Sequence, residues 1–220
     1  MELTIFNGSP RGKVSNTKVL VDQFLDGFMK GSGNSYKIVY LNTTKDSDYL
    51  IKMFEEAEKF LLAFPLYVDS MPAIVKTFIE SLEPLCGRKE NPDIGFLVQS
   101  GLPESIHSRY VERYLKKLSA RLGCNYAGTI IKGGVEGVQA KPVRMNKKLF
   151  NSFHQIGKTF GETGKFDEEI IDRLAQPERY SKFYLWLFKL FGKFWYWDMM
   201  LKKNNAYEKR FAKPYVNNPS

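Results

Sequence analysis

The chain has 220 residues, of which 43% are apolar and 26% charged, and it carries a formal net charge of +9. This length and composition suit one soluble, globular α/β protein, and the sequence contains no internal repeat or long linker. No run reaches the ~18 apolar residues that a membrane span requires, and the first strand begins the chain directly. We therefore expect an intracellular, cytoplasmic protein that has no signal peptide.

Cysteine and histidine usage excludes two further classes of protein. The only cysteines are Cys86 and Cys124, and neither belongs to a Cys-x-x-Cys pair or has a histidine nearby in the sequence. This pattern favours reduced thiols over a disulfide framework. His107 and His154 are isolated and lack the spacing of metal ligands, so we expect no metal site.

Short apolar runs alternate with helical patterns along most of the chain. The runs predict strands at 3–7, 37–41, 59–64, 94–98 and 127–131. Helical patterns begin near residue 16 and recur at 48–58, 72–85 and 104–122. Strands that alternate with helices predict a parallel sheet covered on both faces, and right-handed crossovers make it a doubly wound five-stranded sheet.

The segment 8–17, GSPRGKVSNT, joins the first strand to the first helix. A glycine-rich turn at such a place directs backbone N–H groups and the positive end of the helix dipole to one point, where an anion binds. Ser9, Ser15, Asn16 and Thr17 add side-chain donors. Ser15 or Asn16 also suits a second interpretation, in which the side chain only caps the helix.

Two better-known phosphate loops do not match this segment. A Walker loop has a hydroxyl residue where Val14 stands, and a dinucleotide fingerprint has a glycine where Pro10 stands. The remaining interpretation is a loop for a terminal monophosphate.

Ligands of doubly wound sheets bind outside the carboxyl ends of the strands. Two more loops are expected there, at 65–72 and 99–104, with the sequences PLYVDSMP and QSGLPE. The first has aromatic and aliphatic residues between prolines, which suits a stiff wall against a flat ring, although its prolines are also typical of strand and helix boundaries. The second offers polar side chains and a glycine that permits close backbone approach.

With these loops the sequence resembles the NAD(P)H-dependent FMN reductase family of the flavodoxin-like superfamily. The resemblance covers about 1–165 and rests on 7–11 (NGSPR), 15–17 (SNT) and 65–67 (PLY), followed by Met71, Pro72, Lys76, Phe78 and Ile79. It implies a flavodoxin-like fold with bound FMN. The cofactor-binding residues that it implies are Ser9, Pro10, Arg11, Ser15, Asn16, Thr17, Pro65, Leu66, Tyr67, Val68, Gln99, Ser100 and Gly101.

The activity implied by the resemblance is hydride transfer from NADPH or NADH, through flavin N5, to a quinone, nitro compound, free flavin or similar small-molecule acceptor. Tyr67, Gly133 and Gly134 are the implied substrate contacts, although the two glycines also suit a simple turn. Orienting two flat rings requires no catalytic acid or base, and none is named. Two alternatives stay open: a flavodoxin-type electron carrier, which the basic charge disfavours, and a scaffold that docks to a membrane or partner.

The C-terminal part, 176–220, departs from a minimal flavin domain of 1–175. It carries nine basic and three acidic residues, a net +6, and its segment 180–201 holds all three tryptophans. Lys182, Lys189 and Lys193 fall on one face of a predicted helix that is otherwise largely apolar. This extension suits a homodimer interface or a lid, or a peripheral contact with the inner face of a membrane. No nucleic-acid motif accompanies the basic charge, and we expect no nucleic-acid partner.

Overall fold

The computed structural model describes residues 1–88, 91–192 and 198–213, with the side chains of 188–192 excepted. Its contacts divide the chain into two compact units, 1–179 and 180–220. Residues 176–179 join the first unit because Ser105 N donates to Pro177 O and Ile106 N donates to Glu178 O. Each unit is described separately below.

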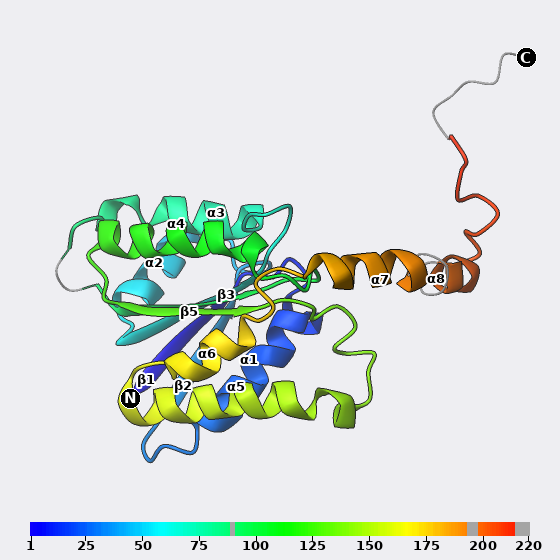
Figure 1. Cartoon of the computed structure of the whole chain (residues 1–220). Helices are drawn as coiled ribbons and strands as arrows, with labels where there is room; N and C mark the ends of the chain where they lie inside the picture. The colour runs from blue at the N-terminus through cyan, green and yellow to red at the C-terminus, as the bar shows by residue number, and fades with distance from the viewer. Residues whose placement is uncertain (89–90, 193–197, 214–220) are drawn as a thin grey trace, which may run out of the picture. The chain divides into compact units, whose positions relative to one another are not determined.

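The first unit is built on a five-stranded, wholly parallel sheet (Figure 1). Its strands have the order β2-β1-β3-β4-β5. This confirms the predicted doubly wound sheet, and the structure has the flavodoxin-like arrangement. The strand bounds are β1 (Glu2–Asn7), β2 (Ser35–Tyr40), β3 (Lys59–Pro65), β4 (Asp93–Gln99) and β5 (Tyr126–Lys132).

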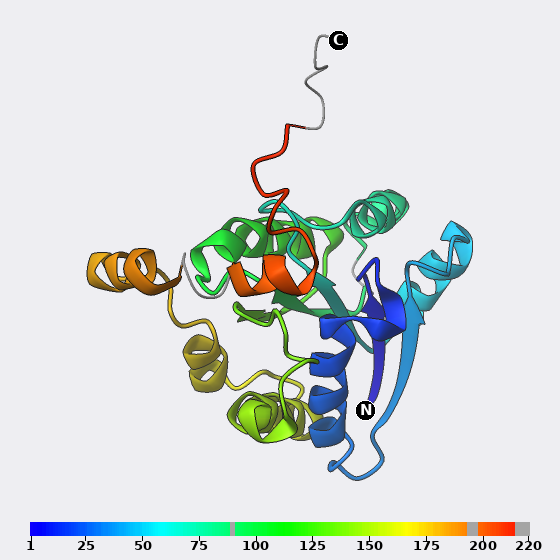
Figure 2. The ribbon, with the colours of Figure 1, turned by 90° about the vertical axis from the view of Figure 1, so that its right-hand side faces the viewer.

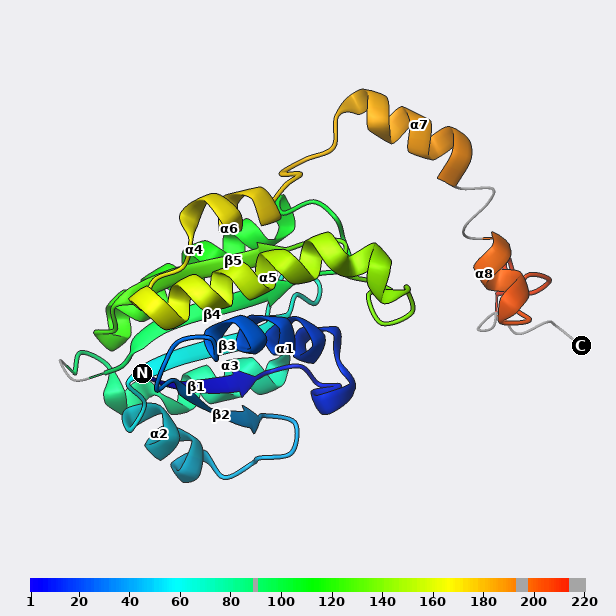
Figure 3. The same ribbon diagram turned by 90° about the horizontal axis from the view of Figure 1, so that it is seen from below.

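Helices cover both faces of the sheet, in two layers (Figures 1 and 3). One face carries α1 (Asn16–Phe28), α5 (Val143–Thr163) and α6 (Glu168–Leu174), and the other carries α2 (Ser47–Glu55), α3 (Ala73–Ser81) and α4 (Ile106–Leu122). Two short 3-10 turns, η1 (Gly12–Val14) and η2 (Glu83–Leu85), complete the unit. Within the described residues no helix is long and apolar enough to cross a bilayer.

Each face of the sheet has its own hydrophobic core. Phe6 and Phe60 pack against Phe78 of α3 on one side. The ring centroid of Phe6 lies 4.8 Å from that of Phe60 and 4.9 Å from that of Phe78. Leu3 and Ile5, which alternate with Phe6 along β1, face α1 and α5 on the other side. Burial on both faces explains why these strands are nearly continuous apolar runs.

The helices α1 and α5 approach each other through glycines. A Cβ added at Gly157 would lie 1.8 Å from Phe24 O, and one at Gly27 would lie 1.9 Å from His154 O. Both distances are far below van der Waals contact, so no other residue fits at either position without separating the helices. This contact fixes α5, and with it the segment that enters α5, against α1.

The strand order reverses at β1, because the chain passes from β1 to β2 on one side and then to β3 on the other. Asn7 pairs with Ala63, Pro65 with Gln99, and Gln99 with Lys132, so the carboxyl ends of four strands reach one edge. Figure 2 views this edge face-on. It is where a doubly wound sheet binds its ligand.

The second unit contains α7 (Lys182–Gly192) and α8 (Asp198–Lys203). Residues 193–197, which belong to the aromatic segment 180–201 predicted above, lie outside the described residues. The predicted lysine face is therefore seen only at Lys182.

Candidate functional site

A small hollow of about 60 Å³ lies at the carboxyl edge of the sheet. Three loops of the first unit contribute to it, after β1, β3 and β4, together with the segment that follows β5. Its lining residues are Ser9, Arg11, Ser15, Asn16, Pro65, Leu66, Tyr67, Gln99, Ser100, Gly101 and Glu136.

The loop after β1 is held tightly by backbone hydrogen bonds. Gly8 N donates to Ala63 O at 2.8 Å, which prolongs the pairing of β1 with β3. Ser9 N donates to the Asn7 side-chain oxygen at 3.0 Å, and Gly12 N donates to Ser9 O at 2.9 Å. Gly12 has φ 53°, a conformation that favours glycine. These bonds turn the chain back on itself and bring it to the start of α1.

Ser15 is the N-cap of α1. Its Oγ accepts from Lys18 N at 3.1 Å and donates to Gly12 O at 2.6 Å, so Ser15 does cap the helix. The next two backbone N–H groups, those of Asn16 and Thr17, have no acceptor within the helix, because helical donors need a carbonyl four residues earlier. Together with the helix dipole they form the positive end that faces the hollow.

The polar groups around this helix start are buried. Ser9, Ser15 and Thr17 are each at most 2% exposed. Among the described residues, Nδ2 of Asn7 is a buried donor without a hydrogen-bond partner. Because such groups are normally paired, this unpaired donor at the end of β1 is available to an electronegative ligand.

The loop after β3 contains a strained turn. Tyr67 N donates to Ser70 O at 2.8 Å and Ser70 N donates back to Tyr67 O at 3.1 Å. The two central residues, Val68 and Asp69, have φ of 49° and 58°, as in a type I′ turn. A β-branched residue is unfavourable there, and backbone strain of this kind concentrates at functional sites.

Helix α4 contacts the same turn. His107 Nδ1 lies 3.2 Å from Asp69 Oδ1, and its Nε2 lies 4.0 Å from Glu104 Oε2. The imidazole thus links the strained turn to the first turn of α4.

The loop after β4 joins the other two. Gln99 Nε2 donates to Thr17 Oγ1 at 3.2 Å, and Gln99 O accepts from Leu66 N at 2.7 Å. Ser100 N donates to Lys132 O at 3.0 Å, which continues the pairing of β4 with β5. Gln99 therefore fixes α1 and the loop after β3 to the same strand end.

The segment after β5 closes over the start of α1, which the sequence analysis did not anticipate. Asn16 Nδ2 donates to Val135 O at 3.2 Å, and Gln139 Nε2 donates to Asn16 Oδ1 at 2.7 Å. Glu136 brings a carboxylate into the lining of the hollow. Gly133 and Gly134 in this segment were named in the sequence analysis, but no motif marks residues 135–139.

Most of the predicted site residues meet at this hollow, and a few do not line it. Ten of the lining residues were predicted, and Glu136 was not. Gly133 and Gly134 instead pack on the loop after β4, where a Cβ at Gly133 would lie 2.5 Å from Pro103 O, and Gly134 N donates to Leu102 O at 3.0 Å. The predicted residues that do not line the hollow are Pro10, Thr17, Val68, Gly133 and Gly134.

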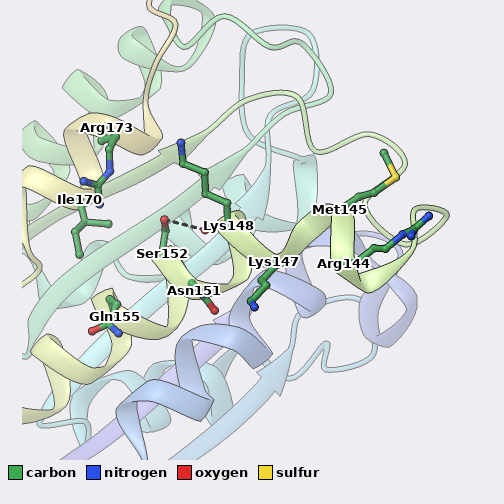
Figure 4. Close-up of a pocket in the computed structure, with 9 residues that line it drawn as sticks. All are labelled: Arg144, Met145, Lys147, Lys148, Asn151, Ser152, Gln155, Ile170 and Arg173. Atoms are coloured by element: carbon green, nitrogen blue, oxygen red, sulfur yellow. Dashed lines mark hydrogen bonds between the residues drawn. The ribbon is translucent and has the colours of Figure 1, made fainter.

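A second, larger hollow of about 610 Å³ lies between α5 and α6 (Figure 4). Its charged lining is wholly basic, with Lys148 and Arg173 from the two helices and Arg144 and Lys147 nearer the start of α5. All four residues are exposed, so this is a positively charged groove on the surface and not an enclosed binding site. Nowhere in the described parts of the chain do three or more His, Cys, Asp or Glu residues gather to hold a metal ion.

No family model and no curated protein matches the sequence. Solved structures do resemble the fold. An azoreductase from Bacillus anthracis strain Sterne is 14% identical, with a TM-score of 0.59 that covers 73% of this chain and 100% of that one. An NAD(P)H:quinone oxidoreductase from Methanothermobacter marburgensis is 13% identical, with a TM-score of 0.58 covering 73% and 96%.

A third structure contains a ligand. It is an FMN-dependent NADH-azoreductase from Bacillus anthracis strain Ames Ancestor in complex with FMN, 12% identical, with a TM-score of 0.57 covering 73% of this chain and 100% of that one. At these identities the likeness shows the shared flavodoxin-like fold.

Proposed function

We propose that this protein is an FMN-dependent NAD(P)H oxidoreductase that reduces a small-molecule acceptor such as a quinone, a nitro compound or free flavin. The observation that carries the proposal is the buried, donor-rich hollow at the N-terminus of α1, placed where the strand order reverses. The names of two structural neighbours support it, since one is an FMN-dependent NADH-azoreductase and the other an NAD(P)H:quinone oxidoreductase.

The residues present fit the phosphate end of FMN. Ser9, Asn16 and Arg11 line the hollow, and the unpaired Asn7 Nδ2 belongs to the last residue of β1, two residues before Ser9. Hydroxyl, amide and guanidinium donors at a helix N-terminus are the chemistry that a phosphate needs. A hollow of about 60 Å³ accepts a small anionic group and leaves a ring system on its rim.

The rim suits an aromatic ring. Tyr67 is 45% exposed, and Leu66 and Pro65 extend the apolar surface from the end of β3. Bound FMN would supply the chemistry that passes electrons from a nicotinamide to the second substrate. The protein's own residues would bind the phosphate, hold the ring against the loop after β3, and leave one ring face open to substrate. No side chain is assigned as a catalytic acid or base.

The domain organisation that we propose is an FMN-binding domain at 1–175 followed by a C-terminal extension at 176–220. A homodimer and a cytoplasmic location remain predictions; static light scattering of the purified chain tests the former.

The phosphate assignment is tested by comparing FMN with riboflavin, which lacks the phosphate. Ser9→Ala should weaken FMN binding about 10- to 100-fold, because a hydrogen bond to a charged group contributes about 1.5–3 kcal/mol. Riboflavin affinity should change less than about twofold. Ser152→Ala is the matched control, since this hydroxyl donates to Lys148 O of its own helix and is not among the residues that line the hollow at the sheet edge. Equal losses for both ligands would contradict the assignment.

The activity is tested by anaerobic titration of the FMN-loaded protein with NADPH and then NADH, following flavin absorbance. Bleaching that is fast enough for turnover supports the proposed oxidoreductase. A bound flavin that stays oxidised would point instead to an electron carrier, and failure to bind FMN at all would point to a scaffold.

A further inference from the structure

The second unit exposes large apolar side chains along α7. Phe183 is 69% exposed and Trp186 is 57% exposed, and Tyr184, Leu185 and Leu187 are exposed as well. A helix of 11 residues is about 16 Å long, whereas the hydrocarbon core of a bilayer is about 30 Å thick. Over its described residues the helix therefore presents an exposed apolar surface but is too short to span a membrane.

The first unit does not need these side chains for its core. Among the described residues, both hydrophobic clusters draw all their members from the first unit, and together they cover both faces of the sheet. The contacts of the chain also separate 180–220 as a unit of its own. An exposed apolar helix outside a finished domain is a surface for an external partner.

The charge of the same unit indicates the kind of partner. Residues 180–220 carry eight basic and two acidic side chains, about two-thirds of the net charge of the whole chain. Lys202 and Lys203 lie in the last turn of α8, where their positive charges interact favourably with the negative end of the helix dipole. Lys202 Nζ and the Arg210 guanidinium lie 5.0 Å and 3.8 Å from the ring centre of Tyr207, so cations and aromatic rings are interleaved.

We propose that the second unit, through its described parts 180–192 and 198–213, docks this protein to the surface of an anionic lipid bilayer. The aromatic and aliphatic side chains of α7 would enter the interfacial layer, where Trp and Tyr are favoured, while the lysines contact lipid headgroups. A second copy of the segment would bring two net +6 charges together, which disfavours self-association through it. A nucleic-acid duplex would neutralise the charge but, because its bases are stacked on one another, would leave the exposed Phe and Trp unburied.

The proposal is testable without labelling, because all three tryptophans lie within 180–201. Tryptophan emission therefore reports on the second unit alone. The full-length, FMN-free protein is titrated with vesicles of phosphatidylcholine and with vesicles that also contain phosphatidylglycerol. We expect a blue shift and a rise in intensity with the anionic vesicles, weaker binding to the neutral ones, and a loss of affinity as salt screens the charges.

Two pairs of substitutions separate the apolar from the electrostatic contribution. Phe183→Ser with Leu187→Ser keeps every tryptophan and should weaken binding to both vesicles on the order of tenfold. Lys202→Gln with Lys203→Gln should weaken binding to anionic vesicles about 25-fold and leave binding to neutral vesicles nearly unchanged, since each basic residue near such a surface contributes about fivefold. Vesicle co-sedimentation measures all four affinities.

The matched control removes the same charge elsewhere. Lys147→Gln with Lys148→Gln alters the basic groove of the first unit and should change vesicle binding less than about twofold. An equal loss in this control would overturn the assignment to the second unit, because charge anywhere on the chain would then suffice. Unchanged tryptophan emission with anionic vesicles would also overturn it. A blue shift that appears without lipid as the protein concentration rises, together with a rise in molecular mass, would overturn it in favour of self-association. Tighter binding to a DNA oligonucleotide than to the vesicles would overturn it as well.

Discussion

Replacing Val68 with asparagine should stabilise the first unit. Val68 occupies the first central position of the Tyr67–Ser70 turn with φ 49°, and it is 99% exposed. A left-handed backbone costs an ordinary L-residue about 1–2 kcal/mol, whereas asparagine tolerates this conformation. Because the valine buries almost no surface, its removal loses almost no hydrophobic free energy. We expect the free energy of unfolding to rise by about 1 kcal/mol.

Urea unfolding of the FMN-free chain, followed by far-UV circular dichroism, measures this difference. In a unit of this size, about 1 kcal/mol corresponds to a Tm increase of roughly 2–4 °C. Val143→Asn is the control, because Val143 is also well exposed but begins α5 with an ordinary helical backbone. Its effect should stay within about 0.5 kcal/mol. If Val68→Asn were no more stable than the natural chain, the strain argument would be refuted.

The same substitution tests why a strained valine is present. If the loop after β3 supports the flavin ring as proposed, an apolar side chain at position 68 contributes contact that asparagine does not. FMN affinity should then fall by about fivefold, or about 1 kcal/mol, while stability rises. A variant that gains stability and binds FMN as well as the natural chain would show that Val68 has no part in the site.

Three further predictions follow from contacts in the first unit. Gly133→Ala should cost about 1–3 kcal/mol in urea unfolding, because its Cβ would meet the Pro103 carbonyl; an unchanged midpoint would contradict this close approach. Glu136→Gln should strengthen FMN binding about fivefold by removing a carboxylate from the lining, whereas affinity equal to the natural chain's would place that carboxylate away from the ligand. Burial alone would raise the pKa of Asp93, but hydrogen bonds from Lys59 and Asn125 lower it. The ionised carboxylate therefore stabilises the fold above about pH 4, and this stabilisation is lost as the pH falls further. Asp93→Asn should therefore destabilise the chain at neutral pH by an amount that shrinks in acid, and a pH-independent difference would argue against this ion pair.

The sheet could be predicted from the sequence because its strands are buried on both faces. Burial makes each of them a short apolar run with few polar interruptions, and the five runs fall within about two residues of the observed strands. The loop after β1 could also be predicted, because a strand, a glycine-rich turn and a capped helix are all local in sequence. Ser15 illustrates this, since its hydroxyl caps α1 as its position predicted.

The contacts of the segment after β5 could not be predicted in this way. Its contacts with the site join Asn16 to Val135 and Gln139, residues more than a hundred positions apart. A single amide side chain carries no sequence signal for such a partner, and neither glutamate nor glutamine in a loop indicates which ligand it faces. The strain at Val68 was equally hidden, because valine is typical of strands and not of type I′ turns.

The closeness of α1 and α5 explains how this distant segment reaches the site. Gly27 and Gly157 let the two helix backbones touch, and the start of α5 is tied in turn to the segment by Asn146 Nδ2, which donates to Val138 O at 2.8 Å. A bulkier residue at either glycine would move α5 away from α1 and with it the partners of Asn16. The geometry of the candidate phosphate site therefore depends on helix packing far from it, so that Gly157→Ala should weaken anion binding as well as stability even though Gly157 touches no ligand.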